Sequence, residues 1–150
     1  MTKNKKVNAA ILIIGNEILS GRTQDTNTGT IAIWLNSIGV KVNEVRVIPD
    51  IEDTIIDTVN HLRKISDYVF TTGGIGPTHD DITAQSISKA FKLEYEIHIE
   101  AFKILEAYYK KGEFNEGRQK MVWMPKKANL ILNPTSGAPG FNVENVFCLP

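Results

Sequence analysis

Residues 67–83 read DYVFTTGGIGPTHDDIT, an apolar stretch that runs into a glycine-rich loop and then into two adjacent carboxylates. Residues 67–72 have the composition of a buried strand, and a helix is expected over residues 82–91. In an open parallel sheet, ligands bind beyond the carboxyl ends of strands, where loops enter the following helices. The stretch therefore predicts an α/β fold with a ligand site at this loop.

The preceding segments alternate between strand and helix patterns. Residues 7–14 and 41–47 read as strands, and apolar residues at helical spacing predict helices over residues 25–39 and 50–66. Asp25 or Thr26 is the expected N-cap of the first helix. The order strand, helix, strand, helix, strand, loop, helix is typical of a mostly parallel sheet with right-handed crossovers.

The second half of the chain is less regular. A helix is expected over residues 99–109, a short one over residues 115–123, and a loop over residues 133–141. Two short strands are predicted on either side of Glu144–Asn145. The sequence stops directly after the second of these strands, so we expect the natural domain to continue past Pro150.

Composition indicates one domain over residues 1–150, because 150 residues of which 42% are hydrophobic can bury one core. Seventeen basic residues balance seventeen acidic ones, so no overall field favours nucleic acid or an anionic membrane as partner. The single cysteine, Cys148, fits a cytoplasmic protein. No segment has the roughly 20 apolar residues of a membrane span.

The glycines of the loop suit a bound anion. Gly73, Gly74 and Gly76 would let backbone amides approach a phosphate, and the following helix would add its own N–H groups. The loop lacks the Gly-Lys-Ser/Thr ending of Walker A and the G-x-G-x-x-G of dinucleotide sites. The expected ligand is a small molecule that carries a phosphate.

Asp80 and Asp81 would repel that phosphate unless a cation lies between them. Mg²⁺ takes oxygen ligands from carboxylates and phosphates together, which would make Asp80 and Asp81 metal ligands. The alternative is that one of them caps the following helix and the glycines make only a turn. Both interpretations stay open on the residues alone.

Three strings together resemble a known family: TTGGIGPTHDDIT at residues 71–83, GNEILSG at 15–21 and NPTSGAPGF at 133–141. They are similar to the molybdopterin-binding domain family of molybdenum-cofactor biosynthesis, closest to the branch that contains CinA, the competence/damage-inducible protein. The resemblance implies a three-layer α/β sandwich around a mostly parallel sheet. It also implies a homo-oligomer with a pterin or nucleotide pocket at the strand ends.

The resemblance also implies roles for individual residues. Asp81 would be the catalytic acid linked to Mg²⁺, with Asp50 as a second catalytic acid, although Asp50 can equally be read as a helix N-cap. The ligand-binding positions would be Gly15, Glu17, Gly73, Gly74, Gly76, Thr78, Thr83, Ser136, Gly137, Ala138, Pro139 and Gly140.

One departure from the family pattern bears on activity. The adenylylating relatives carry Arg before the key acid, where this chain has Asp80, which favours the CinA-like branch. The expected function is therefore a CinA-like domain that binds molybdopterin or a nucleotide, with Mg²⁺-dependent pyrophosphate hydrolysis or adenylyl transfer as its activity. The alternative is a binding module without catalysis.

Overall fold

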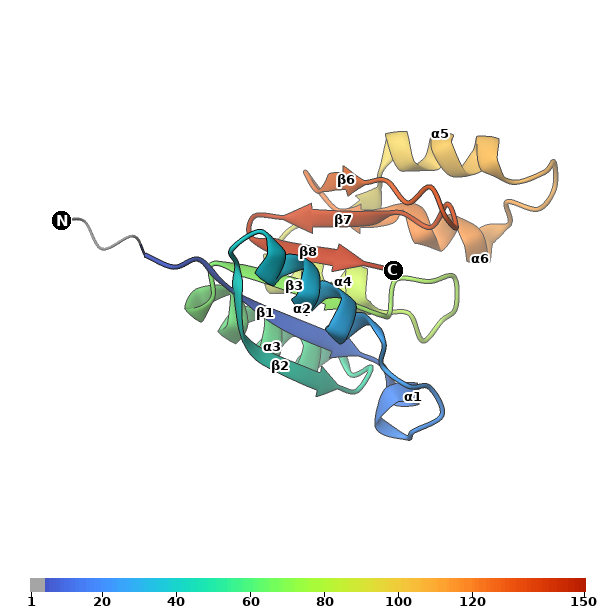
Figure 1. Cartoon of the computed structure of the whole chain (residues 1–150). Helices are drawn as coiled ribbons and strands as arrows, with labels where there is room; N and C mark the ends of the chain where they lie inside the picture. The colour runs from blue at the N-terminus through green and yellow to red at the C-terminus, as the bar shows by residue number, and fades with distance from the viewer. Residues whose placement is uncertain (1–4) are drawn as a thin grey trace.

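A computed structural model describes residues 5–150 of the chain, which fold around a six-stranded sheet (Figure 1). The strands lie in the order β2-β1-β3-β8-β7-β6, and the first four are mutually parallel. The last two are antiparallel to their neighbours. In this order the strands are Lys41–Ile48, Asn8–Ile14, Tyr68–Thr72, Val146–Leu149, Gly140–Val143 and Asn129–Ile131.

Helices cover both faces of the sheet, so the predicted three-layer α/β sandwich is confirmed. Helix α2 (Asn27–Ser37) packs on one face, where Leu35 meets Ala9 and Phe70. The opposite face carries a larger core formed with α3 (Glu52–Ile65), α4 (Thr83–Ala90) and α5 (Ile99–Tyr108). Figure 1 shows α2 in front of the sheet and α3 behind it.

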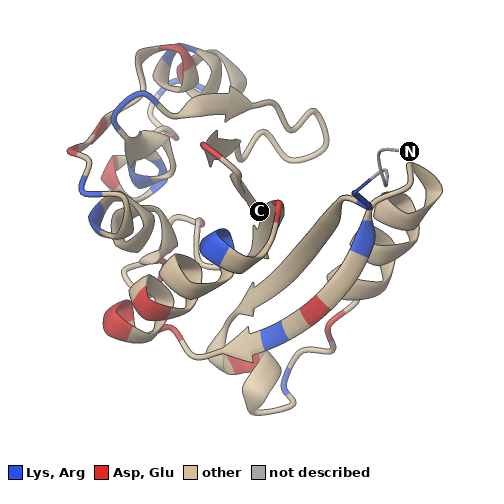
Figure 2. Ribbon diagram, turned by 90° about the vertical axis from the view of Figure 1, so that its left-hand side faces the viewer, with Lys and Arg blue, Asp and Glu red and all other residues tan. Residues whose placement is uncertain are grey.

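Strand β1 lies inside the sheet and is covered on both faces, as its apolar run Ala9–Ile14 predicts. Strand β2 is an edge strand that alternates exposed and half-buried residues. Its charged residues are Lys41, Glu44 and Arg46. Figure 2 shows basic and acidic positions along the ribbon of an outer strand. Charges on an edge strand discourage pairing with another chain.

The second half contains elements that the sequence does not predict. Strand β4 (Tyr95–Ile97) pairs antiparallel with β5 (Trp123–Pro125). In the first half, a short helix α1 (Asn16–Leu19) that the sequence also does not predict follows β1. The helix expected over residues 115–123 is wrong in its second half. Only α6 (Glu116–Gln119) is α-helical, a 3₁₀ turn η1 (Lys120–Val122) follows, and Trp123 already belongs to β5 because Lys126 and Pro125 tie this segment to β4.

The loops that follow β1, β2 and β3 meet at one edge of the sheet, because these strands are parallel neighbours. Figure 1 shows α1 at this end, beyond the tips of β1 and β2. Helices long and apolar enough to span a bilayer do not occur among residues 5–150.

Candidate functional site

The glycine loop is locked against its neighbours by close approaches that only glycine permits. Gly73 and Gly74 have φ of 92° and 72°, in the left-handed region. A Cβ on Gly73 would lie 2.0 Å from the carbonyl oxygen of Ile14, and one on Gly74 would lie 2.1 Å from Thr83 Oγ1. These two glycines therefore bring the loop against β1 and the first turn of α4.

Thr83 holds the loop from the other side. Its hydroxyl donates to the carbonyl oxygen of Gly73 at 3.0 Å, and its amide donates to that of Gly74 at 2.9 Å. Thr83 is fully buried. The carbonyl groups of the loop are thus turned toward α4, and Thr83 acts as a brace of the loop.

The amide groups of the loop differ from its carbonyl groups. Within the described residues 5–150, the amides of Gly74, Ile75 and Gly76 donate no hydrogen bond to another protein atom. An unpaired amide next to a solvent-accessible loop is a donor available to an anion. The loop therefore retains the donor set that its glycines predict.

Asp81 is fixed by the loop itself. Its Oδ2 accepts from Thr78 N at 2.8 Å and from Thr78 Oγ1 at 2.7 Å, which leaves Oδ1 free of these bonds. A Cβ on Gly76 would lie 2.9 Å from Asp81 Oδ2. Helix α4 is capped by Ile82 without a side-chain hydrogen bond, so the interpretation of Asp81 as a helix cap is wrong.

Asp80 points elsewhere than Asp81. Its side chain is 77% exposed, and its Oδ1 lies 3.2 Å from His79 Nε2. The side chains of Asp80 and Asp81 therefore do not converge on one point in this structure. Asp80 contributes negative charge near Asp50.

Asp50 joins the site from the end of β2. Its Oδ2 accepts from Asn16 N at 2.9 Å, so it links β2 to the start of α1. Helix α3 is capped by Ile51, and the interpretation of Asp50 as its N-cap is wrong. Asp50 Oδ1 lies 3.5 Å from the position of a Cβ on Gly74, which places this free oxygen beside the loop.

The electrostatics of Asp50 report on its neighbours. Burial raises the pKa of the Asp50 carboxyl above its usual value, and the negative charges of Glu17, Asp81 and Asp80 raise it further, against the Asn16 amide. Glu17 itself folds back over Gly15, where its Oε1 lies 2.5 Å from a Cβ position. Three loops thus bring acidic groups to one place.

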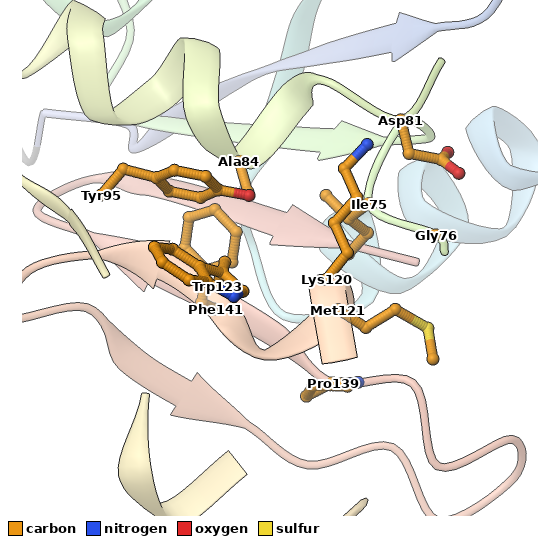
Figure 3. Close-up of a pocket in the computed structure, with 11 residues that line it drawn as sticks. Ile75, Gly76, Asp81, Ala84, Tyr95, Lys120, Met121, Trp123, Pro139 and Phe141 are labelled. Atoms are coloured by element: carbon orange, nitrogen blue, oxygen red, sulfur yellow. The ribbon is translucent and has the colours of Figure 1, made fainter. Parts of the chain in front are cut away.

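Lys120 is a residue of the site that sequence reasoning missed. Its Nζ donates to the carbonyl oxygen of Thr78, and the side chain lines a small cavity with Gly74, Gly76 and Asp81. Figure 3 shows its amino group reaching toward Asp81. The cavity of about 10 Å³ has room for roughly one water-sized sphere, so the cation and the loop nearly touch.

Residues 136–140, the predicted ligand-binding positions of the loop at 133–141, lie in different surroundings. Pro139 lines the cavity beside the glycine loop, and Gly140 begins β7. Ser136 accepts from Asn133 Nδ2 at 2.8 Å, while Gly137 lies against the ring of Tyr108 on α5. Ala138 packs on the main core. Of residues 136–140, the structure brings Pro139 to the glycine loop.

A second cavity opens on the other side of Gly73. It holds about 190 Å³ and is lined by Glu17, Asp25, Asn27 and Gly73 among others. Asp25 accepts from the amides of Asn27 and Thr28, which makes it the side chain that caps the start of α2. Acidic groups therefore line both hollows, with Asp81 at the first and Glu17 and Asp25 at the second.

Comparisons with known proteins bear on this arrangement. The family described as "probable molybdopterin binding domain" matches residues 10–150. The chain belongs to this molybdopterin-binding family. The structure of the protein CinA from Thermoplasma acidophilum is 33% identical, with a TM-score of 0.88, over 95% of this chain and 87% of that one. The chain is thus a CinA-like member.

Two curated relatives extend well past the shared region. A protein from Caldivirga maquilingensis is 39% identical over 138 residues, 91% of this chain and 54% of the relative. A CinA-like protein from Citrifermentans bemidjiense is 38% identical over 137 residues, 90% of this chain and 33% of the relative. The chain spans about half the length of several curated relatives that it matches.

Whether the acidic groups of this molybdopterin-binding-type domain fit Mg²⁺ follows from their donor atoms. Within residues 5–150, no three Asp, Glu, His or Cys side chains form a ready-made metal site. Asp50 and Asp81 each keep one carboxylate oxygen outside the hydrogen bonds described above. Mg²⁺ often binds through one or two carboxylates together with water and substrate phosphates. The residues fit such a site and not an all-protein cage.

Proposed function

We propose that this molybdopterin-binding-type domain binds the phosphate of a pterin or nucleotide at the glycine loop. The observation that carries the proposal is the set of unpaired amides at residues 74–76 with the Lys120 ammonium beside them. Amides and a lysine supply donors and positive charge to a phosphate that lies beside this cavity, since the cavity itself has room for only about one water-sized sphere. They also offset the repulsion of the nearby carboxylates.

Activity on that phosphate is the finer part of the proposal. Mg²⁺ would be held by the free oxygens of Asp81 and Asp50 and would neutralise phosphate charge during pyrophosphate hydrolysis or adenylyl transfer. The protein's own part is to hold the phosphate on the loop amides and Lys120. Asn16 and Thr78 would hold the two carboxylates in orientation through the bonds that they donate.

A second candidate, a binding module without catalysis, is favoured by a different observation. Asp80 turns to solvent beside His79, which leaves the site fewer metal ligands than the sequence suggests. Such a module would bind the same phosphate and release it unchanged. We also propose, from the family, that the protein is a cytoplasmic homo-oligomer. Sedimentation equilibrium measures its oligomeric state.

Calorimetric titration of ADP into the protein, with Mg²⁺ and with a chelator, tests the proposal. We expect binding in both conditions, tighter with Mg²⁺, and Lys120→Met should weaken it by about tenfold or more. Lys126→Met is the matched control, because Lys126 pairs with Glu94 on the β4–β5 side. Chromatography of the nucleotide after incubation distinguishes the two candidates, because an enzyme converts the nucleotide to product and a binding module leaves it unchanged. Equal affinity of the Lys120 variant and the parent would contradict the proposed site.

A further inference from the structure

A third hollow lies next to the glycine-loop cavity and shares three of its residues. It holds about 410 Å³ and is lined by Gln85, Tyr95, Glu116, Gln119, Lys120 and Trp123. Tyr95, Lys120 and Trp123 also line the small cavity at the loop. The two hollows therefore adjoin at these side chains. The proposed phosphate site uses only the loop end.

Two aromatic rings form the far end of this surface. Tyr95 and Trp123 come from the paired strands β4 and β5, in which Tyr95 faces Pro125 and Trp123 faces Ile97. Side chains two residues apart on a strand share a face, so the two rings meet diagonally, with centroids 5.3 Å apart and planes at 46°. Trp123 is 36% exposed.

Polar groups border the rings. Gln119 Nε2 donates to the carbonyl oxygen of Phe114, which leaves its side-chain oxygen as an acceptor. Gln85 and Glu116 are exposed at the rim. Amide and carboxylate groups around an aromatic surface can bond the edge of a flat heterocycle while its face stacks on the rings.

The surface has phosphate-binding groups at one end and aromatic rings at the other, which matches a ligand in which a phosphate is joined to a flat ring. Figure 3 shows Tyr95 and Trp123 at one end, Asp81 and Gly76 at the other, and Lys120 reaching toward Asp81. A phosphate at the loop would place an attached ring toward the aromatic end. Burial raises the pKa of the Tyr95 hydroxyl, which stays protonated and able to donate at neutral pH.

We propose that Tyr95 and Trp123 form the subsite on which the planar nitrogen heterocycle of the ligand stacks, while its phosphate lies at Lys120 and the glycine loop. The inference rests on the proposed function for the phosphate end and adds the ring-binding end. The heterocycle can belong to a purine nucleotide or to a pterin, and the two share a flat face and polar edges.

Fluorescence gives a direct test because the chain has only two tryptophans, Trp34 and Trp123. Trp34 lies on α2, on the other face of the sheet, and packs against Phe70. In Trp34→Phe, emission comes from Trp123 alone, and ADP or a pterin phosphate should quench it at saturation. In Trp123→Phe, the same ligands should leave the emission of Trp34 unchanged. The ligand that quenches at the lower concentration binds more tightly, and this comparison identifies the heterocycle.

Affinity measurements complete the test. Stacking of a base on an aromatic side chain contributes enough that Trp123→Ala should weaken ADP or pterin phosphate binding by about 5- to 140-fold. Trp123→Phe should restore most of the loss, and Trp34→Ala should have no effect. Inorganic pyrophosphate, which lacks a ring, should bind the parent and Trp123→Ala alike. Circular dichroism checks that each variant is folded.

The outcomes separate the two proposals. If pyrophosphate binds and neither ADP nor the pterin phosphate binds more tightly or quenches Trp123, the ring subsite is wrong and the phosphate site stands. If either ring-bearing ligand quenches Trp123 but Lys120→Met and pyrophosphate show no phosphate site, the subsite stands and the proposed function fails. If no ligand binds, both are wrong.

Discussion

At the scale of single residues, the main result is that charges which look alike in sequence have different surroundings. Asp80 and Asp81 are adjacent, yet one is exposed beside His79 and the other is bonded twice to Thr78. Asp50 is distant in sequence, yet its free oxygen lies beside the glycine loop. Two carboxylates that are adjacent in sequence therefore concentrate negative charge but need not bind the same ligand.

Asp81→Asn tests the role of the bonded carboxylate. The amide oxygen of Asn can still accept from Thr78, so the free energy of unfolding should change little. ADP binding without Mg²⁺ should improve slightly, because one negative charge near the phosphate is gone. Any Mg²⁺-dependent turnover should fall by roughly two orders of magnitude. Calorimetry and product chromatography measure both effects.

Asp57→Asn is the charge-matched control, since Asp57 is exposed on α3. If Asp81→Asn binds ADP like the parent both with Mg²⁺ and with a chelator, Asp81 only shapes the loop, and the proposed metal-assisted chemistry is wrong.

Asp50→Asn tests the electrostatics of the site through stability. The pKa of Asp50 is raised in the folded protein, so folding binds its proton more tightly than the unfolded chain does. Its contribution is fully present below the unfolded pKa near 4 and is lost as pH rises through the folded pKa. The variant should therefore be at least as stable as the parent at pH 7, and its advantage should shrink toward pH 3.

Urea denaturation of the two proteins at several pH values measures that difference. A variant that is less stable at pH 7 than at pH 3, relative to the parent, would show that the Asn16 bond outweighs burial and the neighbouring negative charges at this position.

At the scale of elements, the loop between β3 and α4 depends on contacts that its glycines permit. Gly74→Ala places a methyl group 2.1 Å from Thr83 Oγ1 at a positive φ, so both strain and a clash oppose it. We expect a loss of roughly 2 kcal/mol or more in the free energy of unfolding. Thermal and urea denaturation measure it.

Gly39→Ala provides the matched control. Gly39 follows α2 with φ of 83°, but no atom lies within 4 Å of its added Cβ. It should therefore cost only about 1 kcal/mol, the conformational part of the effect. Equal losses for the two variants would show that the contact with Thr83 contributes nothing beyond backbone conformation.

The sequence predicts some elements far better than others, for physical reasons. Strand β1 and helix α3 can be predicted because each has a clear local pattern, a continuous apolar run in β1 and apolar residues at helical spacing in α3. Strands β4 and β5 have three residues each, and their pairing across residues 97–123 leaves no local pattern. Lys120 was missed for the same reason, since only this pairing and η1 aim it at the loop.

For the glycine loop, the sequence predicts the backbone geometry but not the directions in which the side chains point. The glycines mark the loop because positive φ and close approach require them. The sequence alone does not predict that Asp81 accepts a hydrogen bond from Thr78, or that Asp50 accepts one from Asn16 and caps no helix. It also does not predict that Gly137 lies against Tyr108 and not against the glycine loop. Those outcomes depend on tertiary packing.

At the scale of the whole molecule, Cys148 reports on global unfolding. It is fully buried on β8, between β3 and β7, and burial raises the pKa of its thiol to about 12. The thiolate is the reactive form, so the native protein should resist thiol reagents at pH 8. Labelling should proceed only at the rate at which the sheet opens.

The same shift makes stability depend on pH. The unfolded thiol loses its proton near pH 8.5 to 9, while the folded one keeps it to about pH 12, so stability falls as pH rises between these values. The fall reaches at most about 1.4 kcal/mol per pH unit. Cys148→Ala should remove this part of the slope between pH 8.5 and 10. Rapid labelling of the native parent under mild conditions would contradict both expectations.

The strand order has a consequence for how the chain is made. Strand β8 lies in the middle of the sheet and pairs Val146 with Val69, although it comes from the last residues of the sequence. Until those residues leave the ribosome, β3 has an open side and β7 has no central partner. Synthesis at roughly 5–20 residues per second thus leaves an incomplete sheet waiting for seconds. During that interval the open side of β3 has unpaired backbone groups that can pair with another chain.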